Sequence, residues 1–141
     1  MKLHPDKSTV QTITGYGDTW VAVDGERIDS SVIVGSGGQR IVWPCSRFSD
    51  LGAALFCRLA ELDTELVIFG SGRTQRFPRP AWLAPLMQRR LGFEAMDTMA
   101  ACRTYNILST EGRKVVVALL IEVPSGSQSE RQLAPEMHVA R

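Results

Sequence analysis

Residues Glu65–Arg73 read ELVIFGSGR, an apolar run followed directly by a glycine-rich turn. The run Leu66–Phe69 is bounded by Asp63-Thr64 before it and by Gly70 after it. An uninterrupted apolar run of this kind is typical of a parallel strand that is covered on both faces. The stretch therefore predicts a fully buried parallel strand that ends in a tight turn.

Helical patterns lie on both sides of this strand. Leucines recur at spacings of four and three within Leu51–Leu62, and Ser49 is the expected N-cap of that helix. A second helix is expected to begin at Pro80, because the missing N–H of proline costs nothing in a first turn. Gly92 should end this second helix as a left-handed C-cap.

The C-terminal part of the chain continues the alternation of strand and helix. A short strand at Phe93–Met96 precedes a helix that Asp97-Thr98 should cap and Gly112 should end. The inner face of this helix is expected to carry Ala101, Cys102, Tyr105 and Leu108. The last strand, Lys114–Glu122, is the most apolar segment of the chain.

Shorter strand patterns fill the N-terminal part. They cover Thr12–Tyr16, Trp20–Val23, Glu26–Ile28, Ser31–Val34 and Arg40–Trp43. Asp24-Gly25 is a strong hairpin signal, since both central residues of a type I′ turn need positive φ. Together the patterns predict one α/β domain, residues 1–123, with a mostly parallel central sheet, helices on its faces and an added N-terminal hairpin or meander. The polar segment 124–141 is expected to be a disordered tail.

The composition is that of an ordinary globular domain, and the net charge of +1 gives no general attraction to nucleic acid or anionic membrane. The longest apolar stretch, Val115–Ile121, is too short to span a bilayer. Cys45, Cys57 and Cys102 form no CxxC pair and favour reduced thiols, with Cys57 and Cys102 expected in the core. The first residues lack the apolar segment of a signal peptide, so we expect a cytoplasmic protein.

The first candidate site is the turn Gly70, Ser71, Gly72 and Arg73. The carboxyl ends of parallel strands line the ligand crevice of α/β sheets, and Arg73 could pair with an anion there. The pattern is neither a dinucleotide fingerprint nor a P-loop. A tight turn with a solvated or ion-paired arginine remains the alternative.

The second candidate site comprises Asp97, Thr98, Arg103 and Asn106. Asp97 lies between a strand and a helix, so it either only caps the helix or meets Arg73 in a polar pocket at the strand ends. Arg103 and Asn106 lie three residues apart on one helix face, either as contact residues or as a solvated face. No zinc spacing and no hydrolase constellation is present, and we expect no metal and no cofactor.

Two segments also resemble one known family. ELVIFGSGR (Glu65–Arg73) and GFEAMDTMAACRTYNILSTEGRKVVVALL (Gly92–Leu120) are similar to signatures of the complex I assembly factor three family, which includes many uncharacterised bacterial proteins. The resemblance implies a three-layer α/β fold and no established catalytic residues. It places Gly70, Gly72, Arg73, Asp97, Thr98, Arg103, Tyr105, Asn106, Glu111, Gly112 and Arg113 at motif positions. Cys102 departs from the family, where a small residue such as alanine is expected, and the lack of a mitochondrial presequence implies a bacterial member.

These features favour a binding or assembly module with a protein partner, linked by resemblance to respiratory complex biogenesis. The alternative is a domain that binds a small anionic ligand, or a cryptic enzyme, with a strand-end pocket at Arg73 and Asp97. Nucleic-acid binding is the least favoured hypothesis, since only the local basic stretches Arg73–Arg79 and Arg89-Arg90 support it.

Overall fold

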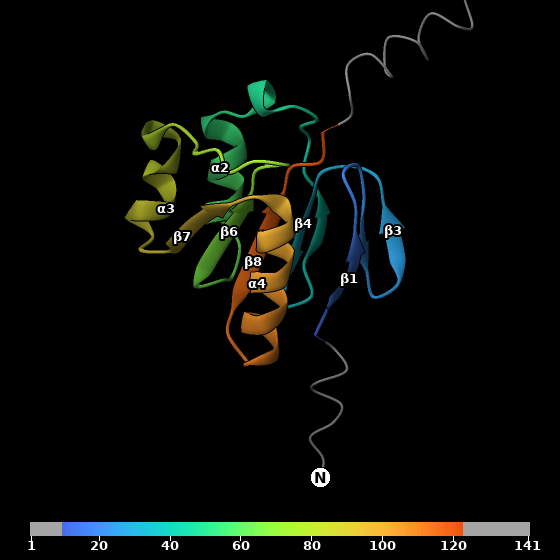
Figure 1. Ribbon diagram of the computed structural model, residues 1–141. Helices are drawn as coiled ribbons and strands as arrows, with labels where there is room; N and C mark the ends of the chain where they lie inside the picture. The colour runs from blue at the N-terminus through green and yellow to red at the C-terminus, as the bar shows by residue number, and fades with distance from the viewer. Residues whose placement is uncertain (1–9, 123–141) are drawn as a thin grey trace, which may run out of the picture.

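The computed structural model describes residues 10–122, which form two β-sheets and three α-helices (Figure 1). The larger sheet has the order β5-β4-β8-β6-β7, and its strands are β4 (Val32–Gly35), β5 (Arg40–Val42), β6 (Leu66–Gly70), β7 (Gly92–Met96) and β8 (Val115–Leu119). The smaller sheet contains β1 (Ile13–Tyr16), β2 (Val21–Val23) and β3 (Glu26–Ile28). The helices are α2 (Ala53–Ala60), α3 (Ala84–Gln88) and α4 (Thr98–Thr110), with 3₁₀ turns η1 (Phe48–Asp50) and η2 (Pro80–Leu83). The predicted tail at 124–141 lies outside the described residues.

The larger sheet is mixed, which corrects the expectation of a mostly parallel sheet, while the α/β class is confirmed. β6 pairs in parallel with both β7 and β8, but β4 is antiparallel to both β5 and β8. The short turn at 36–39 joins β4 to β5, and so short a connection can only link antiparallel strands. No helix of residues 10–122 has the length and apolar character that a membrane span requires.

Strand β8 lies at the centre of the core, because all its residues are buried. Successive side chains of a strand point to opposite faces, so β8 contributes to two apolar clusters. On one face, Val117 and Leu119 pack with Tyr105 of α4 and with the smaller sheet. On the other, Val116 and Ala118 pack with residues of α2 and α3. Full burial of a Val or Leu side chain contributes roughly 1.5–3 kcal/mol to folding.

Aromatic rings fill the cluster on the α2 side. Trp43 is buried and contacts Phe56 and Phe69 edge to face. Trp82 of η2 is partly buried and stacks on Phe56, with their ring centroids 5.9 Å apart. This arrangement fastens α2 and η2 to the sheet.

The predicted bounds of α4 are confirmed. The Asp97 carboxylate accepts a hydrogen bond of 2.9 Å from the Ala100 N–H at the N-terminus. At the C-terminus, Gly112 has φ +86° and the Arg113 N–H donates to the Leu108 carbonyl, as in a Schellman motif. The hairpin turn at Asp24-Gly25 is also confirmed, since both residues have positive φ.

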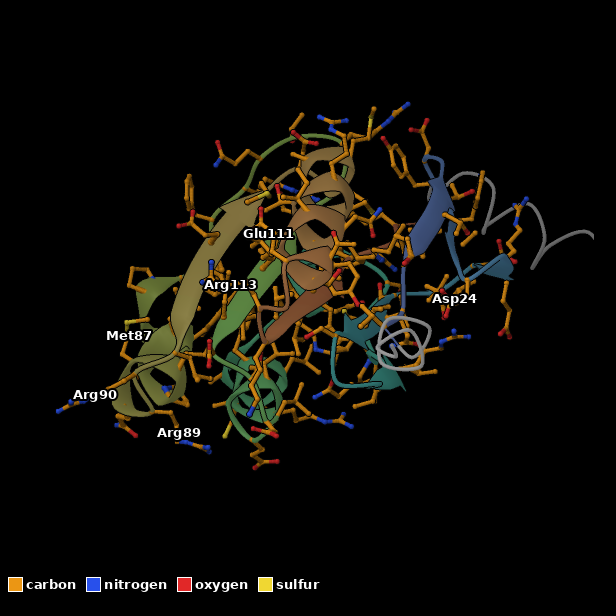
Figure 2. The ribbon with its side chains drawn as sticks, turned by 90° about the horizontal axis from the view of Figure 1, so that it is seen from below. Asp24, Met87, Arg89, Arg90, Glu111 and Arg113 are labelled. Carbon is orange, nitrogen blue, oxygen red and sulfur yellow. The ribbon has the colours of Figure 1, made fainter. Side chains whose placement is uncertain are left out.

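Two predicted helix ends are wrong. Ser49 lies inside η1 and does not cap α2, which begins after Gly52. The carboxylate of Asp50 accepts backbone N–H groups that precede it, and this local turn separates η1 from α2. Gly92 begins β7 instead of ending a helix. Arg90, which follows α3 (Figure 2), takes the left-handed conformation, and its φ is +60°.

One of the two predicted core cysteines is wrong as well. Cys57 is exposed on α2, because the apolar face of that helix is carried by Phe56, Leu59 and Ala60. Cys102 is buried as expected, and burial raises the pKa of its thiol to about 12. A thiol with so high a pKa stays protonated and unreactive at neutral pH.

Helix α4 holds the smaller sheet through Asn106. The side-chain amide donates to the Ile13 carbonyl and accepts from the Ile13 N–H, both at 2.9 Å. The Tyr105 hydroxyl donates to the Gln11 carbonyl at 2.9 Å in the same region. Asn106 is thus a structural link between α4 and β1.

Replacing Asn106 by alanine removes both hydrogen bonds to Ile13. We expect Asn106→Ala to lower the free energy of unfolding by about 2 kcal/mol, or about 1 kcal/mol for each bond. Amide hydrogen exchange should rise more in β1 than in β6 or β8. Ile107→Ala, at an exposed neighbouring position, is the control and should change stability by less than about 0.5 kcal/mol. Equal loss of protection in β1 and β8 would contradict this role.

Candidate functional site

The candidate loop begins where β6 meets α4. A Cβ atom on Gly70 would lie 2.7 Å from the Leu119 side chain and 3.1 Å from the Cβ of Ala101. The bare backbone at this position lets the first turn of α4 lie against the sheet. Gly72 and Thr98 then bond each other twice: the Gly72 N–H donates to Thr98 Oγ1 at 2.9 Å, and the Thr98 N–H donates to the Gly72 carbonyl at 2.8 Å.

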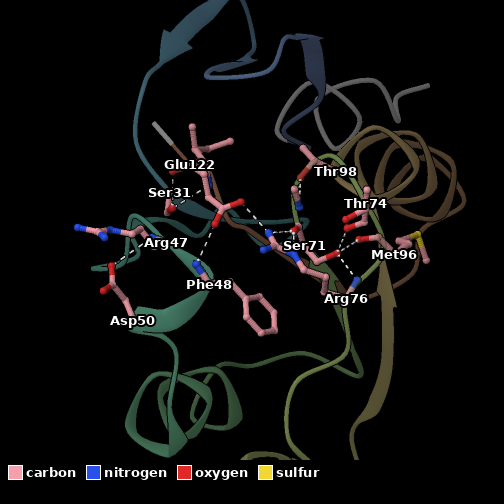
Figure 3. Close-up of polar contacts among 12 residues, drawn as sticks. Ser31, Arg47, Phe48, Asp50, Ser71, Thr74, Arg76, Met96, Thr98 and Glu122 are labelled. Atoms are coloured by element: carbon pink, nitrogen blue, oxygen red, sulfur yellow. Dashed lines mark hydrogen bonds and ion pairs between the residues drawn. The ribbon is translucent and has the colours of Figure 1, made fainter. Parts of the chain in front are cut away.

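Ser71 is buried, and its own loop uses its hydroxyl (Figure 3). Its Oγ lies 2.7 Å from the Thr74 carbonyl and 3.2 Å from the Met96 carbonyl, and can donate its proton to either. The same oxygen accepts the Arg76 N–H at 2.8 Å. These contacts make Ser71 a structural residue that shapes the loop, with its hydroxyl directed away from solvent.

Arg76 anchors this loop to distant parts of the chain. Its guanidinium pairs with Glu122 Oε1 at 2.6 Å, donates to the Ser71 carbonyl, and lies 4.5 Å from the centre of the Phe48 ring (Figure 3). The second oxygen of Glu122 accepts the Phe48 N–H at 2.9 Å. The sequence pattern placed Arg76 only in a basic stretch, because no local signal connects residues so far apart in the chain.

Arg73 and Asp97 line a common hollow of about 260 Å³, together with Gly72 and Thr98. Arg73 and Asp97 do not pair with each other. Arg73 forms an ion pair of 2.9 Å with Asp18, and both side chains are more than two-thirds exposed. An exposed pair of this kind contributes little to stability, so Arg73 can exchange its partner at little cost. Asp97 is held by α4 as its N-cap.

The outer side of α4 carries a line of exposed side chains at spacings of four. Met99, Arg103 and Ile107 lie on successive turns, and we call these three residues the α4 ridge. Met99 is 52% exposed and Ile107 is 58% exposed, while Arg103 reaches the Tyr16 hydroxyl at 3.4 Å. Because Met99 also lines the hollow, the ridge and the hollow form one continuous surface.

The eight predicted site residues therefore lie in one region but have different positions in it. Gly72, Arg73, Asp97 and Thr98 line the hollow, while Gly70 and Ser71 are buried residues of the same loop. Arg103 belongs to the ridge, while the amide of Asn106 is engaged with β1. Sequence reasoning missed Met99 and Ile107, although their spacing of four from Arg103 is readable as a helix ridge.

A family model described as "Protein of unknown function (DUF498/DUF598)" matches residues 13–120. The chain belongs to this family. Its resemblance to complex I assembly factor three is also confirmed. "NADH dehydrogenase (ubiquinone) 1 alpha subcomplex assembly factor 3" of Bos taurus is 33% identical over 119 residues, 82% of this chain and 62% of the bovine protein. The chain thus spans less than two thirds of that relative.

Two bacterial proteins with solved structures are similar to this chain in sequence and fold. A crystal structure from Bordetella parapertussis is 41% identical, with a TM-score of 0.76, and the match covers 81% of this chain and 98% of that one. A solution structure from Bordetella pertussis, described as a Mth938-like domain, is 33% identical, with a TM-score of 0.72, and the match covers 90% and 98%.

The contact between Arg76 and Glu122 gives a direct test of how the loop is held. In Glu122→Gln, the amide group cannot accept from both Arg76 and the Phe48 N–H, so we expect a loss of about 1–2 kcal/mol in the free energy of unfolding. Asp63→Asn removes a pair with Lys114 that is mostly exposed, and should cost less than about 0.5 kcal/mol. Denaturant unfolding of the two variants measures the difference, and equal costs would show that the Glu122 contacts do not hold the loop.

Proposed function

We propose that the chain is a protein-binding, assembly-factor-like module that holds its partner on the α4 ridge and the adjoining hollow. The observation that carries this proposal is the ridge itself. Met99 and Ile107 are large apolar side chains, more than half exposed, on either side of Arg103. Met and Arg are enriched in protein interfaces, and Arg73 adds an exposed cation beside the ridge.

Family membership supports the same role. The bovine relative is named as an assembly factor of NADH dehydrogenase, and we extend this to the present chain as a role in the biogenesis of a respiratory complex. The similar proteins from Bordetella support a bacterial setting, and we place the protein in the bacterial cytoplasm.

A double change on the ridge tests this proposal. Covering the remaining exposed surface of Met99 or Ile107 should contribute about 1.4 kcal/mol to binding for each residue, which is about tenfold in affinity. In Met99→Glu/Ile107→Glu, a partner captured by the full chain in its native host should fall by at least about tenfold. Cross-linking in the host followed by quantitative mass spectrometry measures the captured amount.

Met87 offers a closely matched control. It is 53% exposed, against 52% for Met99, and it lies on α3 near Arg89 and Arg90 (Figure 2). Met87→Glu should keep both the melting temperature and the partner. The ridge would be refuted as the binding surface if Met87→Glu lost the same partner. It would also be refuted if the ridge variant captured as much partner as the unchanged chain.

The second candidate function is the binding of a small anion in the hollow, favoured by the exposed guanidinium of Arg73. A carboxylate or phosphate would displace Asp18 from Arg73 and gain a charge-assisted hydrogen bond. At a concentration one hundred times its Kd, such a ligand should stabilise the fold by about 2.7 kcal/mol.

Thermal unfolding with millimolar phosphate or citrate distinguishes this second candidate. The stabilisation should disappear in Arg73→Ala and persist in Arg27→Ala, which removes a comparable exposed pair with Asp29. An equal response of both variants would indicate general ion effects and would exclude the hollow as the site.

A further inference from the structure

Within residues 10–122, strand β7 is the last strand on one side of the larger sheet, and one side of its backbone has no strand beside it. The Gly92 N–H donates to the Glu65 carbonyl, and the Met96 carbonyl accepts from the Ser71 N–H. In a parallel pair, every second residue directs its backbone groups at the neighbouring strand. Gly92, Glu94 and Met96 therefore face β6, and the residues between them face outward.

The outward residues are Phe93 and Ala95. Within residues 10–122, the Ala95 carbonyl accepts a hydrogen bond of 2.8 Å from the Gln75 side chain. The Phe93 N–H, the Phe93 carbonyl and the Ala95 N–H have no hydrogen-bond partner among the described residues. An unpaired row of this kind is a template for an added strand unless it is blocked by the protein itself.

An apolar hollow of about 500 Å³ opens beside this row. Its walls include Phe77 and Pro78 from the loop after β6, Leu83 from η2, and Phe93. Phe77 is 68% exposed, the largest exposed fraction among the exposed large apolar side chains of residues 10–122. The hollow can therefore accept apolar side chains from a segment lying along β7.

Glu94 determines the charge that such a segment should carry. Its side chain alternates with those of Phe93 and Ala95, so it points to the other face of the sheet. Glu94 is exposed and forms no ion pair with the described residues. Opposite charges directly across two strands stabilise the pair by roughly 0.2–1 kcal/mol, and like charges destabilise it.

We propose that the free edge of β7 binds an extended segment of another protein as an added strand. The segment has apolar residues that alternate with lysine or arginine. Its apolar side chains enter the hollow beside Phe77, and its basic side chain lies opposite Glu94. Its backbone pairs with the N–H and carbonyl of Phe93 and with the N–H of Ala95, because the Ala95 carbonyl is bonded to Gln75. This surface is separate from the α4 ridge and depends on different observations.

The probe is an acetylated and amidated hexapeptide of alternating valine and lysine, titrated into the full chain and followed by amide chemical shifts. Shifts should concentrate at Phe93, Ala95 and Phe77. A valine–glutamate hexapeptide should bind about fivefold more weakly. N-methylation of alternate backbone nitrogens in the valine–lysine peptide should abolish the shifts, because an added strand needs those N–H groups.

Two variants at exposed positions test whether the preference between the two peptides depends on the charge at residue 94. Glu94→Lys should reverse the preference between the two peptides, and Asp29→Lys, the same change of charge beside the smaller sheet, should leave the preference unchanged. Reversal by Asp29→Lys, or binding of the N-methylated peptide, would show nonspecific attraction and overturn the proposal.

Hydrogen exchange without peptide tests whether the edge is free. The Phe93 amide should exchange fast in the full chain at every protein concentration. Slow exchange that is independent of concentration would mean that the chain's own residues cover the edge, and slow exchange only at high concentration would mean a second copy. Either result would overturn the proposal.

Discussion

The absence of a side chain at Gly70 sets how closely α4 approaches the sheet. A methyl group at this position would lie 3.1 Å from the Cβ of Ala101 and 3.4 Å from the Cα of Thr98, so a larger residue would push the helix outward. The Gly70 carbonyl also accepts the Leu120 N–H at 2.9 Å, which continues the contact with β8 beyond the last strand pair. One bare position therefore aligns β6, β8 and the start of α4, and the hollow forms at their junction.

The glycine-rich turn mainly positions neighbouring groups and provides few free groups of its own. Gly72 adopts φ +104°, which lets its backbone bond Thr98 on both sides. Ser71 closes the turn from within, and Arg73 is left as its exposed cation. A phosphate cradle needs several free backbone N–H groups, but here those of Gly72 and Ser71 are already bonded. The residues of the turn therefore fit a shaped surface better than a nucleotide site.

Local signals are sufficient to predict a helix end where a single side chain bonds the free backbone groups, as Asp97 does at the N-terminus of α4. The prediction of Gly92 as a C-cap is wrong because it rests on the same kind of local signal, a glycine near a helix end. Arg90 takes the positive φ instead. The direction of β4 against β8 could not be predicted, since it depends on packing between segments far apart in sequence. The candidate site was likewise predictable in position but not in its contacts. The strand-end rule placed Arg73 and Asp97 in one region, but they do not pair, because Asp18 from the turn between β1 and β2 reaches Arg73 instead.

The loop after β6 contributes to both proposed surfaces, and its anchor lies between them. Gly72 and Arg73 face the hollow beside α4, while Gln75 and Phe77 form part of the wall beside β7. Arg76 is tied to Glu122. Because this tie joins the loop to the end of the central strand region, contacts made on one surface need not deform the other. Under the two proposals, a folded partner on the α4 ridge and an extended segment along β7 would contact different residues of this loop.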